Sequence, residues 1–238
     1  MPIHYILQID TATQVCSAAL SANGETIACL DVDEPNVHAS RLTPLITQLM
    51  RQAELTFADL SAVAVSKGPG SYTGLRIGVS TAKGLCYATG LPLIGVSTLA
   101  AMADGFAAMG KEMTDPGIQL YPMIDARRME VYTAVFDRDG GQVAPPRAAI
   151  IDAQSFDNLE SGQRAVLFGS GADKLAGLFA GNGRVHVIPG VKNSADYLSR
   201  LAYRAFLAED VVDVAYFEPY YLKDFVATKP KKKPVPSS

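Results

Sequence analysis

Cysteine is scarce in this chain of 238 residues and tryptophan is absent. No two of the cysteines, Cys16, Cys29 and Cys86, form a Cys-x-x-Cys pair, so the sequence predicts neither a disulfide framework nor a cysteine metal site. Cys16 and Cys86 lie within apolar patterns. We expect both to be small buried thiols in a reducing compartment.

Long apolar runs are also lacking. No segment approaches the ~18 consecutive apolar residues of a membrane helix, and the beginning, Met1-Pro2-Ile3-His4, lacks the basic and apolar regions of a secretory leader. Hydrophobic residues make up 48% of the chain and charged residues 19%, a balance typical of a globular protein. We therefore expect a cytoplasmic protein that does not associate with membranes.

The chain has no overall excess of positive charge, because its net charge is −3. This balance indicates that the folded body does not bind RNA on its own. Only the end of the chain is basic: residues 226–238 contain Lys229, Lys231, Lys232 and Lys233 among prolines, without core residues. We expect this segment to be a disordered tail.

Histidine is too sparse for a helical metal site. His4, His38 and His186 are the only histidines, and no two are three or four positions apart. We expect His38 to be a surface or capping residue at a helix start.

Ser71 lacks the Gly-x-Ser-x-Gly context of a hydrolase nucleophile. We therefore predict no metal, no cofactor and no catalytic residue.

The first half alternates between predicted strands and helices. The pattern predicts three strands, over residues 3–10, 15–20 and 25–30. A turn at Asn23-Gly24 is predicted between the last two. Residues 38–53 have apolar side chains at helical spacing, which predicts an amphipathic helix. Its apolar residues include Leu42, Leu45, Ile46 and Leu49.

A glycine-rich segment, Lys67-Gly68-Pro69-Gly70-Ser71-Tyr72-Thr73-Gly74-Leu75-Arg76-Ile77-Gly78, follows an apolar strand and opens a helix. Such a loop presents backbone N–H groups to an anion, but it lacks both the Walker pattern and the third glycine of a dinucleotide fingerprint. It is either a vestigial phosphate site or a tight turn in which Gly74 and Gly78 allow close approach. The second interpretation is favoured. The vestigial site would comprise Asp10, Thr11, Gly68, Gly70, Ser71, Gly169 and Gly171.

Asp10 ends the first predicted strand and is the best candidate acid. It is either a ligand that holds Mg²⁺ through water or a turn residue satisfied by local N–H groups. Asp125 is its counterpart in the second half, and Arg127 and Arg128 beside it would pair with a phosphate, a partner's acid or a neighbouring carboxylate such as Glu130.

The helix predicted to run to about Thr89 is apolar or small on two faces. One face carries Leu75, Val79, Ala82 and Cys86, and the other carries Ile77, Thr81, Gly84 and Ala88. A helix with two such faces is sandwiched, either within the protein or against a partner.

The second half repeats the order of the first. Ile124-Asp125 and the following run 130–135 echo Ile9-Asp10 and 14–19, and residues 165–171 echo the strand and glycine loop after residue 62. The sequence therefore predicts two lobes, each with a mixed sheet and helices, over residues 1–110 and 111–225, followed by the tail 226–238.

Together these motifs resemble the TsaB (YeaZ) family. The segments that carry the resemblance are Ile9-Asp10-Thr11-Ala12-Thr13, the glycine-rich residues 68–78, Gly95-Val96-Ser97-Thr98-Leu99, Ile124-Asp125-Ala126-Arg127 with Glu130-Val131-Tyr132, and Pro219-Tyr220-Tyr221-Leu222-Lys223, where Lys replaces the family's Arg. The resemblance implies an α/β fold of the two-lobed actin/Hsp70/sugar-kinase-like (RNase H-like) class.

The resemblance also implies a function. In that family, TsaB is the non-catalytic partner of the transferase TsaD, and the ATPase TsaE joins them. TsaD transfers a threonylcarbamoyl group to the adenosine next to the anticodon in tRNAs that read codons beginning with A. TsaD carries a His-x-x-x-His metal motif, whose positions fall on Thr98 and Met102 here. These side chains cannot replace two imidazoles.

We expect a scaffold or activator that contacts a TsaD-like paralogue through first-lobe helices, contacts tRNA through the complex, and forms a homodimer when alone. The expected contact residues are Leu42, Leu45, Ile46, Leu49, Leu75, Arg76, Val79, Ala82, Lys83 and Cys86. Two alternatives remain: a kinase-like enzyme that binds ATP in the cleft, and a protease that acts on the paralogue with Ser71 or another hydroxyl as nucleophile.

Overall fold

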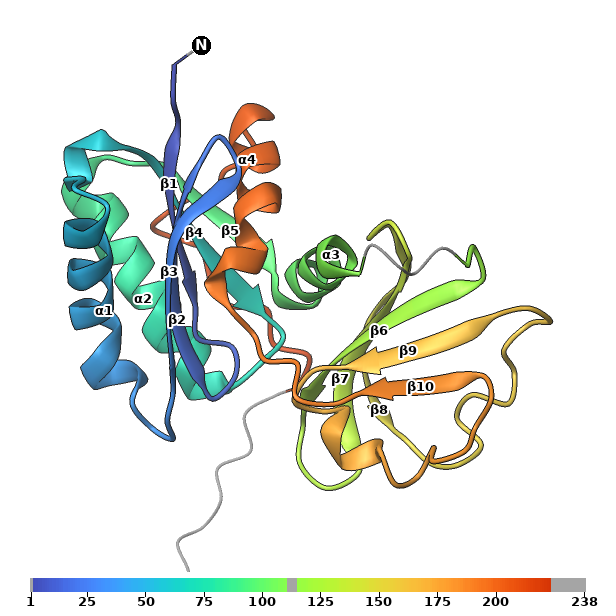
Figure 1. Cartoon of the computed structure of the whole chain (residues 1–238). Helices are drawn as coiled ribbons and strands as arrows, with labels where there is room; N and C mark the ends of the chain where they lie inside the picture. The colour runs from blue at the N-terminus through green and yellow to red at the C-terminus, as the bar shows by residue number, and fades with distance from the viewer. Residues whose placement is uncertain (1, 111–114, 224–238) are drawn as a thin grey trace, which may run out of the picture.

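The structure is a computed structural model that describes residues 2–110 and 115–223. It has two lobes, each built on a five-stranded mixed sheet (Figure 1). The first sheet has the order β3-β2-β1-β4-β5, and α1 and α2 lie together on one of its faces. The elements of this lobe are β1 (Tyr5–Asp10), β2 (Val15–Ala22), β3 (Glu25–Asp33), α1 (His38–Gln52), β4 (Leu60–Gly68), α2 (Tyr72–Thr89) and β5 (Leu93–Ser97).

The second sheet repeats the topology of the first. Its order is β10-β9-β6-β7-β8, so that β6 to β10 occupy the places of β1 to β5. In both sheets the first three strands are antiparallel and the last two run parallel to the central strand. This order confirms the predicted repeat. The strands are β6 (Ile118–Asp125), β7 (Glu130–Asp137), β8 (Gln142–Ile150), β9 (Arg164–Phe168) and β10 (Val185–Ile188).

The helices are not repeated, which differs from the prediction of helices in each lobe. Among the described residues, no α-helix lies between β8 and β10; the connections are turns and a short 3₁₀ helix, Asp173–Leu175. Side chains of these turns, Ile151, Phe156 and Phe179, cover the sheet in place of helices. On the other face lies α3 (Thr98–Met109), where Phe106 stacks on Phe168 with ring centroids 4.0 Å apart.

The apolar faces of α1 and α2 pack on the first sheet, and this corrects the expected contact residues. Seven of them are buried in one cluster with Leu7, Ile9, Val63 and Val65 of the sheet, and Leu75 is buried as well. A contact residue has to reach the surface, so these eight are wrong as partner contacts: Leu42, Leu45, Ile46, Leu49, Leu75, Val79, Ala82 and Cys86. Arg76 is exposed, and half-buried Lys83 donates to the carbonyl oxygens of Ala215 and Phe217.

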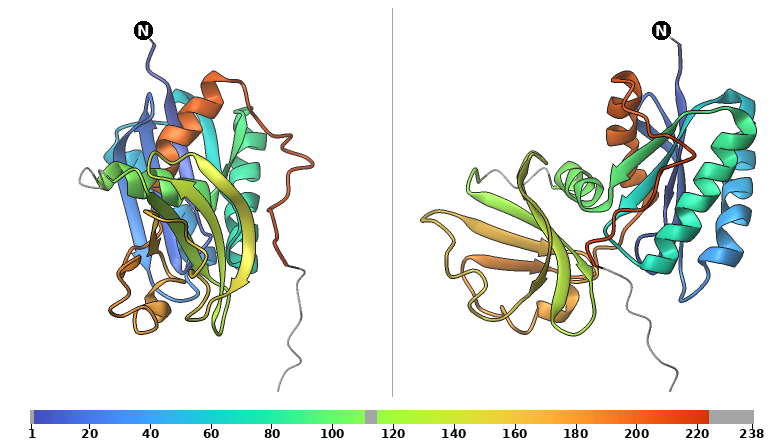
Figure 2. Two further views of the ribbon diagram at one scale, coloured as in Figure 1. Left: turned by 90° about the vertical axis from the view of Figure 1, so that its right-hand side faces the viewer. Right: turned by 180° about the vertical axis from the view of Figure 1, so that it is seen from behind.

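The end of the described chain returns to the first lobe. A 3₁₀ turn, Ala195–Leu198, and α4 (Ser199–Leu207) pack on the second face of the first sheet, against Ile6, Ala62 and Ile94. Beyond α4, Val212 pairs with Leu93 at the edge of β5. The predicted lobe 111–225 therefore ends too late, because residues from about 193 onward belong to the first lobe (Figure 2). The predicted tail, 226–238, lies outside the described residues.

Candidate functional site

A cleft of about 1320 Å³ lies between the lobes. Two turns that correspond through the repeat face each other across it: residues 12–14 after β1, and residues 124–130 after β6. The cleft is also lined by the glycine-rich loop 69–74, the start of α1, Ser170 and the last described segment, 220–223. The cleft therefore collects most of the motifs on which the resemblance rests.

Asp10 does not line this cleft. Its side chain is 1% exposed, and its Oδ1 accepts hydrogen bonds from the Ala12 N–H at 2.8 Å and the Ser66 hydroxyl at 3.1 Å. Burial raises the pKa of Asp10, and these two hydrogen bonds oppose the increase. The carboxylate is thus satisfied inside the first lobe, an arrangement that favours the turn-residue interpretation over a ligand facing the cleft.

The glycine-rich loop is packed against the turn after β1. The Ser71 N–H donates to the Ala12 carbonyl oxygen at 2.7 Å, and a Cβ at Gly70 would lie 2.5 Å from that same oxygen. A Cβ at Gly74 would overlap the carbonyl oxygen of Thr11, and one at Gly78 would overlap the Thr11 hydroxyl. Backbone fills the space that a phosphate cradle leaves open, so this geometry favours a tight turn.

Ser71 acts as the cap of α2. Its hydroxyl accepts from the Gly74 N–H at 3.2 Å, as an N-cap residue does. No hydrogen bond joins it to His38 in the described part of the chain, and His38 Nε2 is buried without a partner. His38 is the first residue of α1 and is buried, so the prediction of a surface or capping residue is wrong. This arrangement lacks the nucleophile–base contact of a hydrolase.

The glycines of the second lobe show the same close packing. The Gly171 N–H donates to the Met123 carbonyl oxygen at 2.9 Å, and a Cβ at Gly169 would overlap the end of the Met102 side chain. The two positions that correspond to the metal motif, Thr98 and Met102, are both buried in α3. The Thr98 hydroxyl accepts from the Gly68 N–H at 3.1 Å. Among the described residues, no group of three or more His, Cys, Asp or Glu could hold a metal ion.

The turn after β6 carries exposed charges into the cleft. Asp125 pairs with Lys174, and Glu130 pairs with Lys223 at the end of the described chain. Arg127 and Arg128 have left-handed backbones, with φ of 73° and 46°, and neither forms an ion pair with another described residue. The sequence pattern singled out this pair, but its left-handed conformation has no sequence signal, since arginine rarely adopts it.

The aromatic side of the cleft was not predicted from the sequence. Tyr221 contacts Tyr72 at a ring distance of 4.9 Å, and the Tyr220 N–H donates to the Lys67 carbonyl oxygen at 2.7 Å. The residues come from segments about 150 positions apart. Only the family motif around Tyr221 marked this segment, and no local pattern says where it packs.

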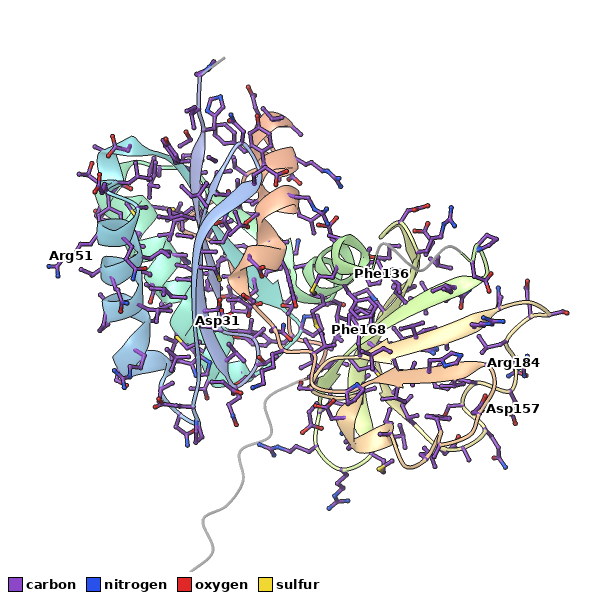
Figure 3. The ribbon with its side chains drawn as sticks, viewed as in Figure 1. Asp31, Arg51, Phe136, Asp157, Phe168 and Arg184 are labelled. Atoms are coloured by element: carbon purple, nitrogen blue, oxygen red, sulfur yellow. The ribbon has the colours of Figure 1, made fainter. Side chains whose placement is uncertain are left out.

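The outer helix face is the exposed surface of α1 and α2 that points away from the sheet (Figure 3). Neither helix contains Asp or Glu, whereas Arg41, Arg51 and Arg76 are exposed. Gly84 lies on this face with no atom within 4 Å of an added Cβ. The exposed residues of this face are Arg41, Thr43, Pro44, Thr47, Gln48, Arg51, Thr73, Arg76, Ser80, Gly84, Tyr87 and Ala88.

Comparison with known proteins supports the resemblance. The family model of TsaD, described as tRNA N6-adenosine threonylcarbamoyltransferase, matches residues 35–165. The TsaB protein of Escherichia coli is 34% identical over 94% of this chain and 96% of its own, and that of Bacillus subtilis is 35% identical over 68% of this chain and 69% of its own.

A solved structure supports the fold class. YeaZ from Pseudomonas aeruginosa superposes with a TM-score of 0.72 at 26% identity, over 92% of this chain and all of that one. The expected two-lobed actin/Hsp70/sugar-kinase-like fold is thereby confirmed. Across the described residues, no helix has the length and apolar character needed to cross a bilayer. The chain belongs to the TsaB family, whose relatives bear the name tRNA threonylcarbamoyladenosine biosynthesis protein.

Proposed function

We propose that this chain is a non-catalytic subunit that binds and activates a TsaD-like paralogue. The paralogue would transfer the threonylcarbamoyl group to the adenosine next to the anticodon of tRNAs that read codons beginning with A. The observation that carries this proposal is the buried pair Thr98 and Met102, at the positions that the resemblance assigns to the metal-binding histidines of the catalytic paralogue. A buried threonine, engaged by the Gly68 N–H, and a thioether cannot supply that pair of imidazoles.

The outer helix face is the surface that we propose for docking. Small side chains at Ser80 and Gly84 would let a partner helix approach α2 closely, with Tyr87 as an aromatic anchor that is 88% exposed. Because α1 and α2 carry arginines and no carboxylate, the face suits a partner surface with acidic residues. When the partner is absent, the same face would pair two copies of the chain.

Gly84 offers the sharpest test of this surface. Gly84→Arg should weaken the association with the paralogue at least about tenfold, because a long side chain fills the space of the incoming helix. Gly84→Ala should bind normally and raise the free energy of unfolding by about 0.5–1 kcal/mol, since Ala favours a helix over Gly. Both variants should fold, because a Cβ at Gly84 meets no atom within 4 Å.

The association would be measured by light scattering and calorimetry on the purified pair. Ala180→Arg, at an exposed position of the second lobe, is the matched control for an added arginine. Undiminished binding by Gly84→Arg would show that the paralogue docks elsewhere. Equal loss in the Ala180→Arg control would contradict the proposed surface as well.

A further inference from the structure

We infer that the rim of the cleft contacts the phosphate backbone of tRNA, with Arg127 and Arg128 as the principal contacts. The inference rests on the proposed function, because it assigns a part of the tRNA-binding surface of the assembled complex to this chain. Its principal contacts lie on the second lobe, outside the outer helix face.

The two arginines are the uncompensated charges of the turn after β6. Asp125 is neutralised by Lys174, and Glu130 by Lys223, whereas the guanidinium groups of Arg127 and Arg128 have no ion-pair partner among the described residues. Both side chains are exposed and line the cleft. Guanidinium groups bind phosphate oxygens with two parallel hydrogen bonds and are weakly hydrated, so this pair suits a phosphodiester chain.

Aromatic side chains lie across the cleft from these arginines. Tyr72 and Tyr221 contact each other, and the guanidinium of Arg76 lies 5.4 Å from the Tyr72 ring centre. Tyr220 also lines the cleft and is 46% exposed. Tyrosine rings next to cations are the usual surface for unstacked nucleotides of RNA. The combination favours a single-stranded or loop region of RNA over a protein partner.

A free nucleotide fits the cleft less well than a polynucleotide. The glycine-rich loop, whose N–H groups the phosphates of a nucleotide would need, is packed against Ala12 through Ser71 and Gly70. The remaining volume of about 1320 Å³ exceeds that of most small-molecule pockets, ~300–1000 Å³. His38 also lines this cleft, and its buried Nε2 has no hydrogen-bond partner.

Lys223 also lies on this rim, where it is paired with Glu130. The described residues stop at Lys223, which lies on the cleft. The whole chain has a net charge of −3, so a local electrostatic contact with RNA depends on Arg127 and Arg128 at this rim.

The test is the binding of tRNA to the complex of this chain with its paralogue at salt concentrations between about 50 and 200 mM. The double variant Arg127→Gln with Arg128→Gln should bind tRNA at least about tenfold more weakly at the higher salt. The slope of log affinity against log salt concentration should be smaller in magnitude by about 1.5, because two phosphate contacts are lost. The double lysine variant should keep most of the affinity.

Arg184→Gln is the matched control, because this exposed arginine lies on the same lobe, far from the cleft (Figure 3). It should leave the affinity and the salt dependence unchanged. The inference is overturned if the double glutamine variant binds tRNA as the unmodified complex does, or if it loses a protein partner instead of tRNA. Size-exclusion chromatography of the same samples reports on assembly, so failure of the proposed function would appear as a missing complex.

Discussion

Two aspartates at equivalent strand ends, Asp10 and Asp125, have different surroundings. Asp10 is enclosed by the first lobe and accepts hydrogen bonds from Ala12 and Ser66, whereas Asp125 is exposed and paired with Lys174. The sequence predicted their equivalence, since both follow an isoleucine at the end of a buried strand. It did not predict their different exposure, because burial depends on which distant segments cover each strand end.

Asp10→Asn should raise the free energy of unfolding at pH 7, because Asn keeps an oxygen for the Ala12 N–H and carries no buried charge. The folded protein raises the pKa of Asp10 above its unfolded value of 3.8. The free energy of unfolding of the protein with Asp10 therefore decreases as the pH increases from 3.8 through the folded pKa. The gain in free energy of unfolding from Asp10→Asn should accordingly be small near pH 4 and larger at pH 7.

Thermal unfolding at both pH values measures this effect, with a change of about 2–4 °C expected for each kcal/mol. Asp157→Asn, at an exposed position, serves as the control and should change little. If the Asp10→Asn variant were less stable than the unmodified chain at pH 7, the charge of Asp10 would be shown to contribute to stability.

Helix α2 has small or apolar residues on two faces, and this pattern does not predict which face packs on the sheet. The sequence predicted both faces of this helix, and one of them is buried: Val79, Ala82 and Cys86 pack on the sheet, and Leu75 is buried as well. We had expected that face to meet the partner. Small and apolar residues occupy both sides of the helix, so its pattern contains no signal for which side faces the sheet. In the structure, the side of the helix that carries Gly84 is exposed.

The glycines of α2 should respond to alanine in opposite ways. Gly78→Ala places a methyl group against the Thr11 hydroxyl and should lower the free energy of unfolding by about 1–3 kcal/mol, whereas Gly84→Ala, in open space, should raise it. Chemical denaturation measures both. Combining Gly78→Ala with Thr11→Ala should restore much of the loss, because the hydroxyl is then gone. Equal effects at both glycines would contradict the packing of α2 on the turn after β1.

The strand order was the most predictable part of the fold. The echo of Ile9-Asp10 in Ile124-Asp125 indicated a duplicated sheet, and the structure has the same five-strand order twice. The helices of the second lobe were overpredicted. Only 13 residues separate Ile150 from Arg164, and their apolar side chains, such as Phe156, cover the sheet from turns.

At the scale of the molecule, the two lobes are joined by segments that no local pattern reveals. The chain returns from the second lobe to form α4, and its last described residues pass along the cleft to the Lys223–Glu130 ion pair. These contacts join residues separated by 93 to 173 positions. Hydrophobic periodicity reports on neighbours within a helix or strand, so it cannot place such a segment.

The cleft and the outer helix face share Thr73 at the start of α2 and are otherwise formed by different residues, and we assign them different roles. The cleft has a glycine-rich loop packed against the turn after β1 and a rim with arginines and tyrosines. The outer helix face carries Gly84, next to which an added Cβ would meet no atom within 4 Å, and its helices contain no Asp or Glu. Together they describe a subunit that would hold a catalytic paralogue with one surface and tRNA with another.

The most direct test of the proposed function is reconstitution of the tRNA modification from purified components. The assay would contain the paralogue, the ATPase, a tRNA that reads codons beginning with A, and the activated threonylcarbamoyl donor, with mass spectrometry of the nucleosides as the readout. We predict modified adenosine only when this chain is present with the paralogue, restoration by Gly84→Ala, and failure with Gly84→Arg. Modification by the paralogue alone at the same rate, or by this chain without the paralogue, would contradict the proposed function.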